Sequence, residues 1–196
     1  NPTEKILISP PLNSKPEFII KGKTLVISVI DTLKPNTTYS FVFSDCIRDI
    51  TEGNVLPNFT YAFSTGNFID SNTIIGKVIN AENLEPEKNI FVLLYKNSND
   101  SLPLTTKPYY ITKTNEKGFF TFGNITQGEF WIYALNDKNN NLIRDQLKEP
   151  FAFNNSKVIS YFPNQQNEQK ELTLRLFNAL DTSQNIVRSF VASKGV

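Results

Sequence analysis

The sequence contains no histidine and no methionine, only one cysteine, Cys46, and only one tryptophan, Trp131. Without histidine the chain has no Ser-His-Asp triad, no Cys-His pair and no histidine ligand for a metal ion. A single cysteine excludes an internal disulfide and leaves the redox compartment open. We therefore expect the chain not to be an enzyme, and Cys46 to be a half-buried small residue rather than a nucleophile.

Excess charge and long apolar runs are missing as well. The 20 basic and 19 acidic residues give a formal net charge of +1, which creates no long-range field for phosphate backbones. The most apolar stretches, residues 25–30 and 90–95, have the length of strands, whereas a membrane span needs roughly 20 apolar residues. We expect neither a nucleic-acid partner nor a transmembrane segment.

The chain is instead rich in aromatic and β-branched residues in short runs, among them 16 phenylalanines and 7 tyrosines. No window keeps an apolar period of 3.6 residues, so this composition predicts an all-β fold with little helix. The predicted strands cover residues 17–21, 25–30, 38–44, 59–64, 73–80, 89–96, 109–114, 119–123, 129–135, 158–162, 172–177 and 186–192.

Alternation along these runs predicts which side chains face the core. Tyr39, Phe41 and Phe43 share one face of their strand, as a half-buried strand requires. Residues 130–135 are apolar on both faces, which predicts a central strand with Trp131 as a core residue. Gly118 follows Asn-Glu-Lys, where a hairpin loop needs a positive φ. The small, polar segment 64–71 predicts a short, stiff connector between two modules.

The first third of the chain carries three ordered motifs. Residues 33–39 read Leu-Lys-Pro-Asn-Thr-Thr-Tyr, residues 47–54 contain Ile-Arg-Asp and Gly-Asn, and residues 63–66 read Phe-Ser-Thr-Gly. This order resembles the C-terminal half of bacterial Ig-like domains of the S-layer type. The resemblance implies an incomplete Ig-like module over residues 1–68.

The following segment carries a second set of motifs. Residues 75–78 read Ile-Gly-Lys-Val. Residues 114–130 follow the pattern Thr-x-x-x-Gly-x-Phe-x-Phe-x-x-Ile-x-x-Gly-x-Phe, where x stands for any residue. The pattern looks like the carboxypeptidase-regulatory or transthyretin-like β-sandwich. It implies such a module over residues 69–178, followed in residues 179–196 by a tail or the start of a further β module. The predicted fold is therefore two consecutive β-sandwich modules.

Together the two resemblances imply a Bacteroidetes-type envelope protein with no catalytic residues to carry over. The expected location is secreted, periplasmic or cell-surface, as an outer-membrane lipoprotein whose signal lies outside these 196 residues. The expected role is structural or adhesive. The expected partners are other domains of the same larger protein, and cell-envelope proteins or glycans.

One loop has the spacing of a calcium site. Oxygen ligands recur at positions one, three, five, seven and nine, the seventh as a backbone carbonyl: Asp137, Asn139, Asn141, Ile143 and Asp145. Leu142 stands where such loops have a turn glycine. Lys148 occupies position twelve, where a bidentate acid is expected, and Glu149 comes one residue late. The alternative is an Asx-rich loop shaped by side-chain to backbone hydrogen bonds.

A second binding hypothesis rests on aromatic residues. Five of them could stack on a carbohydrate if one face were exposed, or could pack alternately into the core: Tyr109, Tyr110, Phe119, Phe120 and Phe122. The acidic residues are scattered among turns, so we expect no pair of carboxylates to act across a cleft as in a glycosidase. A glycan- or calcium-binding module is therefore the alternative to a purely structural one.

Overall fold

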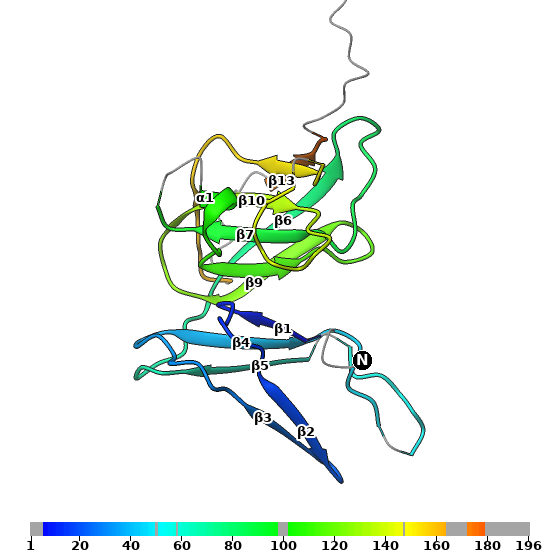
Figure 1. Cartoon of the computed structure of the whole chain (residues 1–196), viewed down its shortest axis with the longest axis vertical. Coiled ribbons are helices and arrows are strands. Elements are labelled where there is room, and N and C mark those ends of the chain that lie inside the picture. The colour runs from blue at the N-terminus through cyan, green and yellow to red at the C-terminus, as the bar shows by residue number, and fades with distance from the viewer. Residues whose placement is uncertain are drawn as a thin grey trace, which may run out of the picture.

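The computed structural model describes residues 6–49, 51–57, 59–97, 102–146, 148–163 and 172–178. Its regular structure is almost entirely strand, with one short helix, and the strands form two β modules that lie end to end in Figure 1. The prediction of an all-β fold with two modules and little helix is confirmed.

The first module contains five strands in two antiparallel sheets. Its strands are β1 (Ile6–Ser9), β2 (Glu17–Lys21), β3 (Thr24–Ser28), β4 (Thr38–Phe43) and β5 (Phe59–Ser64). One sheet has the order β1-β4-β5, and the other is the β2-β3 hairpin. The core lies between them, because Tyr39, Phe41 and Phe43 are buried on one face of β4, as their alternation predicts. Cys46 packs against this cluster and is partly buried, as predicted.

The second module contains the remaining strands and the helix. They are β6 (Asn72–Asn80), β7 (Phe91–Tyr95), α1 (Leu102–Thr105), β8 (Tyr110–Lys113), β9 (Phe119–Ile125), β10 (Glu129–Leu135), β11 (Phe151–Phe153), β12 (Val158–Ile159) and β13 (Leu172–Leu176). One sheet has the order β11-β10-β7-β8, with β12 also on β10, and the other has the order β13-β6-β9. All described pairings are antiparallel except that of β13 with β6, which is parallel.

A large apolar core fills the space between these two sheets. Strand β7 is buried at all five positions because its inner face meets the opposite sheet while its outer face carries a second cluster around Leu93. Strand β10 lies between β11 and β7, which confirms the prediction of a central strand. Trp131 is partly buried and packs against the outer cluster. Leu174 and Leu176 are buried in the inner core.

The structure differs from the sequence prediction in several short elements. Strands β1 and β11 and helix α1, each of three or four residues, were not predicted. The strand predicted from residue 89 begins at Phe91, because Asn89 has a φ of 59°, outside the β region. The strand predicted to reach Phe162 ends at Ile159. Residues 186–192 lie outside the described residues. Gly118 has a φ of 75°, as the hairpin prediction requires.

Candidate functional site

The segment between β5 and β6 is tied to both modules through Asp70. The hydroxyl of Thr38, which is buried at the start of β4, donates a 2.8 Å hydrogen bond to Asp70 Oδ2, and Asp70 N donates back to Thr38 Oγ1 at 2.9 Å. From the second module, Asn124 Nδ2 donates to the Asp70 carbonyl at 3.3 Å. Asp70 therefore joins β4 of the first module to β9 of the second.

The start of the same connector is fixed to the first module. Thr65 Oγ1 donates to the Lys34 carbonyl at 2.6 Å and accepts from Thr37 N at 3.0 Å. A Cβ added to Gly66 would lie 3.0 Å from Asn36 Cα, so the chain passes this point in close contact. These contacts fix the start of the connector on the first module, and the stiffness that its composition predicts stays a prediction.

Strand β1 makes a second bridge between the modules. Ser9 Oγ accepts a 3.0 Å hydrogen bond from Ile111 N on β8, and Lys107 Nζ donates to the Leu12 carbonyl at 3.4 Å. Leu7 packs against the apolar cluster on the outer face of the β7 sheet. One strand of the first module thus contributes both polar and apolar contacts to the second. We refer to the contacts of Thr38, Asp70, Asn124, Ser9 and Leu7 as the joint.

The five aromatic residues considered for carbohydrate stacking do not form one exposed platform. Tyr110, Phe120 and Phe122 are buried in the inner core, which agrees with the core interpretation. Tyr109 is partly buried, and the Lys34 and Lys96 ammonium groups lie 4.7 and 4.0 Å from its ring centroid. Phe119 is exposed, with Lys77 Nζ at 5.4 Å from its ring centroid. The interpretation of this group as a carbohydrate platform is wrong, because side chains alternate along a β-strand and the members therefore point to different sides.

The predicted calcium loop follows β10 and is held by its own hydrogen bonds. The two oxygens of Asp137 accept 2.7 Å bonds from Asn140 N and Leu142 N. Asn139 and Asn141 direct their amide nitrogens to the Asp145 carboxylate, at 3.1 and 2.7 Å for the shorter contacts. The Asn139 and Asn141 oxygens accept from backbone nitrogens two residues on. These are the contacts that an Asx-rich loop is expected to make.

Two features bring the loop closer to a calcium loop than its sequence indicates. Leu142 has a φ of 64°, so it adopts the left-handed conformation that a turn glycine would supply. The Glu149 side chain is 1% exposed, and its oxygens accept long bonds of 3.3 and 3.4 Å from Lys138 N and Gln146 N. A carboxylate at the thirteenth position therefore faces the loop. The Ile143 carbonyl, at the seventh position, accepts a hydrogen bond from Asp145 N.

The electrostatic surroundings of the loop include one partly buried lysine, Lys113. Burial lowers the pKa of Lys113, and the negative charge of Asp137 opposes part of that shift. The Lys113 ammonium group lies 4.0 Å from the centroid of the Phe91 ring. Among residues 6–178 as far as they are described, no group of three or more acidic or cysteine side chains is placed to hold a metal ion. The calcium site stays a prediction.

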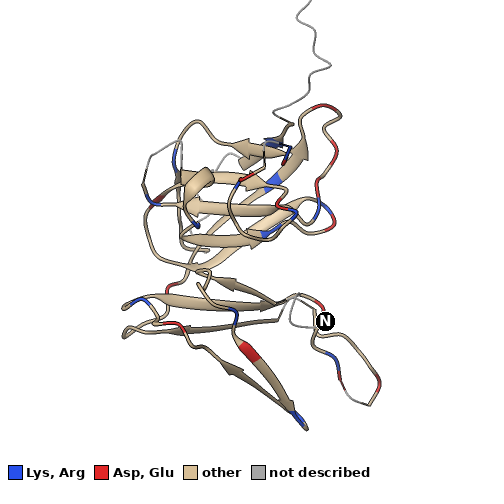
Figure 2. Cartoon of the chain, viewed as in Figure 1, with Lys and Arg blue, Asp and Glu red and all other residues tan. Residues whose placement is uncertain are grey.

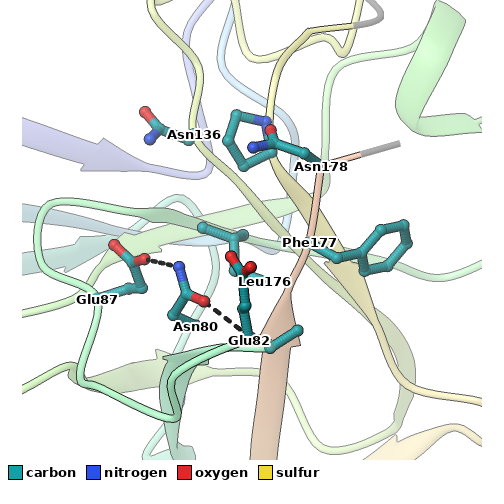
Figure 3. Close-up of a pocket in the computed structure, with 9 residues that line it drawn as sticks. Asn80, Glu82, Glu87, Asn136, Leu176, Phe177 and Asn178 are labelled. Atoms are coloured by element: carbon teal, nitrogen blue, oxygen red, sulfur yellow. Dashed lines mark hydrogen bonds between the residues drawn. The ribbon is translucent and has the colours of Figure 1, made fainter. Parts of the chain in front are cut away.

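A pocket of about 260 Å³ opens beside this loop, at the end of β6 away from the connector (Figure 3). Its walls come from the end of β6, the turn after it, both ends of the loop and the end of β13. The lining residues are Asn80, Ala81, Glu82, Glu87, Asn136, Pro150, Leu176, Phe177 and Asn178. Sequence reasoning did not find this pocket, because its walls come from four segments that are separate in the chain.

Residues 1–65 match the bacterial Ig-like domain. The Ig-like match lies within the first module, and the family of the second module is not identified. Bacterial Ig-like domains are typical of extracytoplasmic and surface proteins. Comparison with curated proteins and with solved structures gave no match.

The motifs that carry the Ig-like resemblance have local structural roles. Tyr39 OH accepts from Lys34 N at 3.0 Å, so the entry to β4 is folded back on its own strand. The Asp49 carboxylate accepts from Thr51 N and Glu52 N at 2.6 and 3.1 Å, which closes the turn at the second motif. No helix in the described part of the chain combines the length and the apolar character needed to cross a membrane.

Proposed function

We propose that this chain is a non-catalytic structural and interaction segment of a secreted or cell-surface bacterial protein. In this proposal the Ig-like module and a transthyretin-like second module act together as one rigid spacer between other domains of a larger envelope protein. The location is supported by the Ig-like match, since such domains are typical of surface proteins. The absence of catalysis is supported by the lack of histidine in the chain.

The observation that carries the spacer is the joint. Two modules on a free linker move independently, which is the ordinary expectation for small inter-domain contacts. Here the connector is bonded at both ends, and the buried Thr38 hydroxyl and the partly buried Asp70 exchange two hydrogen bonds. Loss of the Asp70 carboxylate leaves the buried Thr38 hydroxyl without its acceptor, which costs about 1–3 kcal/mol. The joint therefore opposes bending between the modules.

The distribution of charge also suits a spacer. Figure 2 shows basic and acidic residues interspersed over both modules, many of them in turns and at strand ends. The two described ion pairs, Lys88 with Glu116 and Lys157 with Glu129, are exposed and join neighbouring segments. A mixed surface of this kind favours solubility without steering one class of charged ligand.

The spacer is tested by breaking the joint without unfolding either module. We expect Asp70→Ala to loosen the joint, so that the correlation times of the two modules differ more than in the unaltered chain, because it removes the carboxylate that bonds Thr38 while the contacts of Ser9 and Leu7 remain. The measurement is ¹⁵N relaxation of each module, read as its rotational correlation time. Asp49→Ala is the matched control, since its carboxylate bonds only the adjacent turn. Separate tumbling of the unaltered chain would contradict the spacer.

Calcium binding by the loop 137–145 is the second candidate function. The burial of Glu149 beside the loop favours it, whereas the internal hydrogen bonds of Asn139 and Asn141 favour a loop without an ion. A bound cation stabilises the folded state by mass action. A rise in melting temperature with millimolar Ca²⁺ that Asp137→Asn abolishes would support the candidate. An unchanged melting temperature would contradict the candidate and indicate a loop that is held only by its own hydrogen bonds.

A further inference from the structure

The pocket beside the loop has walls that the backbone holds in place. Ala81 N donates to the Leu176 carbonyl at 2.8 Å, which links the turn after β6 to the end of β13. Asn136 N donates to the Pro150 carbonyl at 3.0 Å, which closes the base of the loop. The pocket therefore exists before any ligand arrives, and binding there needs little reordering of the chain.

Several polar side chains of this pocket still have hydrogen-bonding capacity. Within the described part of the chain, the side-chain amides of Asn136 and Asn178 make no hydrogen bond, and neither does the carboxylate of Glu82. Glu87 Oε1 accepts from Asn80 Nδ2 at 2.9 Å, and its second oxygen has no partner among the described residues. Figure 3 shows these side chains around one space. Two amides and two carboxylates are thus available to a ligand.

The chemistry of these groups selects a class of ligand. An amide both donates and accepts, and a carboxylate accepts from hydroxyl groups in charge-assisted bonds. None of the described residues that line the pocket is a lysine or arginine, so none of them would neutralise a phosphate, sulfate or carboxylate. The volume is below the range of about 300–1,000 Å³ that is usual for drug-sized ligands. A neutral ring bearing several hydroxyl groups meets all three conditions.

An aromatic surface continues from the rim of the pocket. The ring of Phe177, 39% exposed, points away from Asn80 and Glu87 in Figure 3. It meets the ring of Phe153, 49% exposed, with centroids 6.2 Å apart. Exposed aromatic rings are suited to sugar rings, because the C–H groups on one face of a sugar are apolar and can pack against the apolar ring face. A second sugar unit leaving the pocket would reach this surface.

We propose that this pocket binds a neutral oligosaccharide, with one sugar unit among Asn136, Asn178 and Glu87 and the next unit against Phe177. This proposal deepens the interaction part of the proposed function by naming a ligand class. It is independent of the joint, because the pocket lies at the end of β6 away from the connector.

The test is an NMR titration of the ¹⁵N-labelled chain with monosaccharides and trisaccharides of glucose, galactose, mannose and N-acetylglucosamine. We expect saturable shifts at the pocket for at least one neutral sugar. The double variant Asn136→Ala/Asn178→Ala should weaken that binding roughly tenfold or more, since it removes both amides. Phe177→Ala should weaken the trisaccharide while leaving the monosaccharide unchanged.

Asn97→Ala is the matched control, because Asn97 is exposed and does not line the pocket. Equal melting temperatures of the variants separate lost binding from lost folding. The proposal is overturned if no sugar of the panel produces saturable shifts, or if the double variant binds as tightly as the control. It is also overturned if Ca²⁺ alone shifts the pocket resonances and no sugar does. None of these outcomes bears on the tumbling of the two modules.

Discussion

The two modules differ in how completely they enclose their apolar strands. In the second module β7 is buried on both faces, because one sheet covers its inner side and an apolar cluster covers its outer side. In the Ig-like module Phe41 and Phe43 on β4 are each 3% exposed. Their pairing partners on β5 are much more exposed: Tyr61, opposite Phe41, is 54% exposed, and Phe59, opposite Phe43, is 40% exposed. The difference indicates that the second module has a self-sufficient core, whereas the first has a small core and an open flank.

The largest expected effect compares one residue from each module. Leu94→Ala empties a fully buried position on β7 and should cost about 2–5 kcal/mol of unfolding free energy. Tyr61→Ala removes a half-exposed ring at the open flank and should cost less than about 1 kcal/mol. Urea unfolding of both variants measures the two costs. Similar costs would show that the open flank of β5 is covered in solution.

An effect of intermediate size tests how closely the second module is packed around β6. Gly76 lies on β6 between β13 and β9, where an added Cβ would be 2.5 Å from the Leu172 carbonyl oxygen and 2.6 Å from Phe120 Cζ. Gly76→Ala should therefore cost roughly 1–3 kcal/mol. The matched change is Gly123→Ala, where nothing lies within 4 Å, and it should stay within about 0.5 kcal/mol of the unaltered protein. Equal unfolding midpoints for the two variants would contradict close packing at β6.

The smallest effect concerns the pH dependence of stability, through two buried tyrosines of the second module. Burial raises the pKa of Tyr95 and Tyr110, both in the second module, above the ordinary value of 10.0. A raised pKa favours the neutral form in the folded state, so this contribution to stability is full below pH 10 and declines as the pH rises further. We expect Tyr110→Phe to flatten that decline in urea unfolding above pH 10. A decline that Tyr110→Phe leaves unchanged would contradict the assignment.

Much of the fold could be predicted because strand alternation depends on local sequence. The buried face of Tyr39, Phe41 and Phe43 follows from period-two spacing alone, and the central position of β10 follows from its apolar residues on both faces. Some short elements escaped because their three or four residues show no clear alternation, whereas β8, also of four residues, was predicted from its apolar run. Strand β11 is one example: it follows Pro150 and is recognisable mainly by its pairing with β10.

The candidate sites were less predictable because they depend on contacts between distant residues. Thr38 and Asp70 are 32 residues apart, and neither stands in a pattern that indicates the other. The spacing of the calcium loop and the alternative of side-chain to backbone hydrogen bonds were visible in the sequence, but the bonds from Asn139 and Asn141 to Asp145 were not. Nothing local distinguishes buried Glu149 from its exposed neighbour Lys148, because burial is decided by how the loop returns to the sheet. The pocket needs the ends of β6 and β13 side by side, which only the topology provides.

The most direct test of the central claim is to measure residual dipolar couplings for backbone amides of both modules in one weakly aligned sample. If the joint makes the modules one rigid spacer, a single alignment tensor will fit the couplings of β4 and β7 together, at the relative orientation seen in Figure 1. Two tensors of different magnitude would mean that the modules move independently, and the spacer would be contradicted.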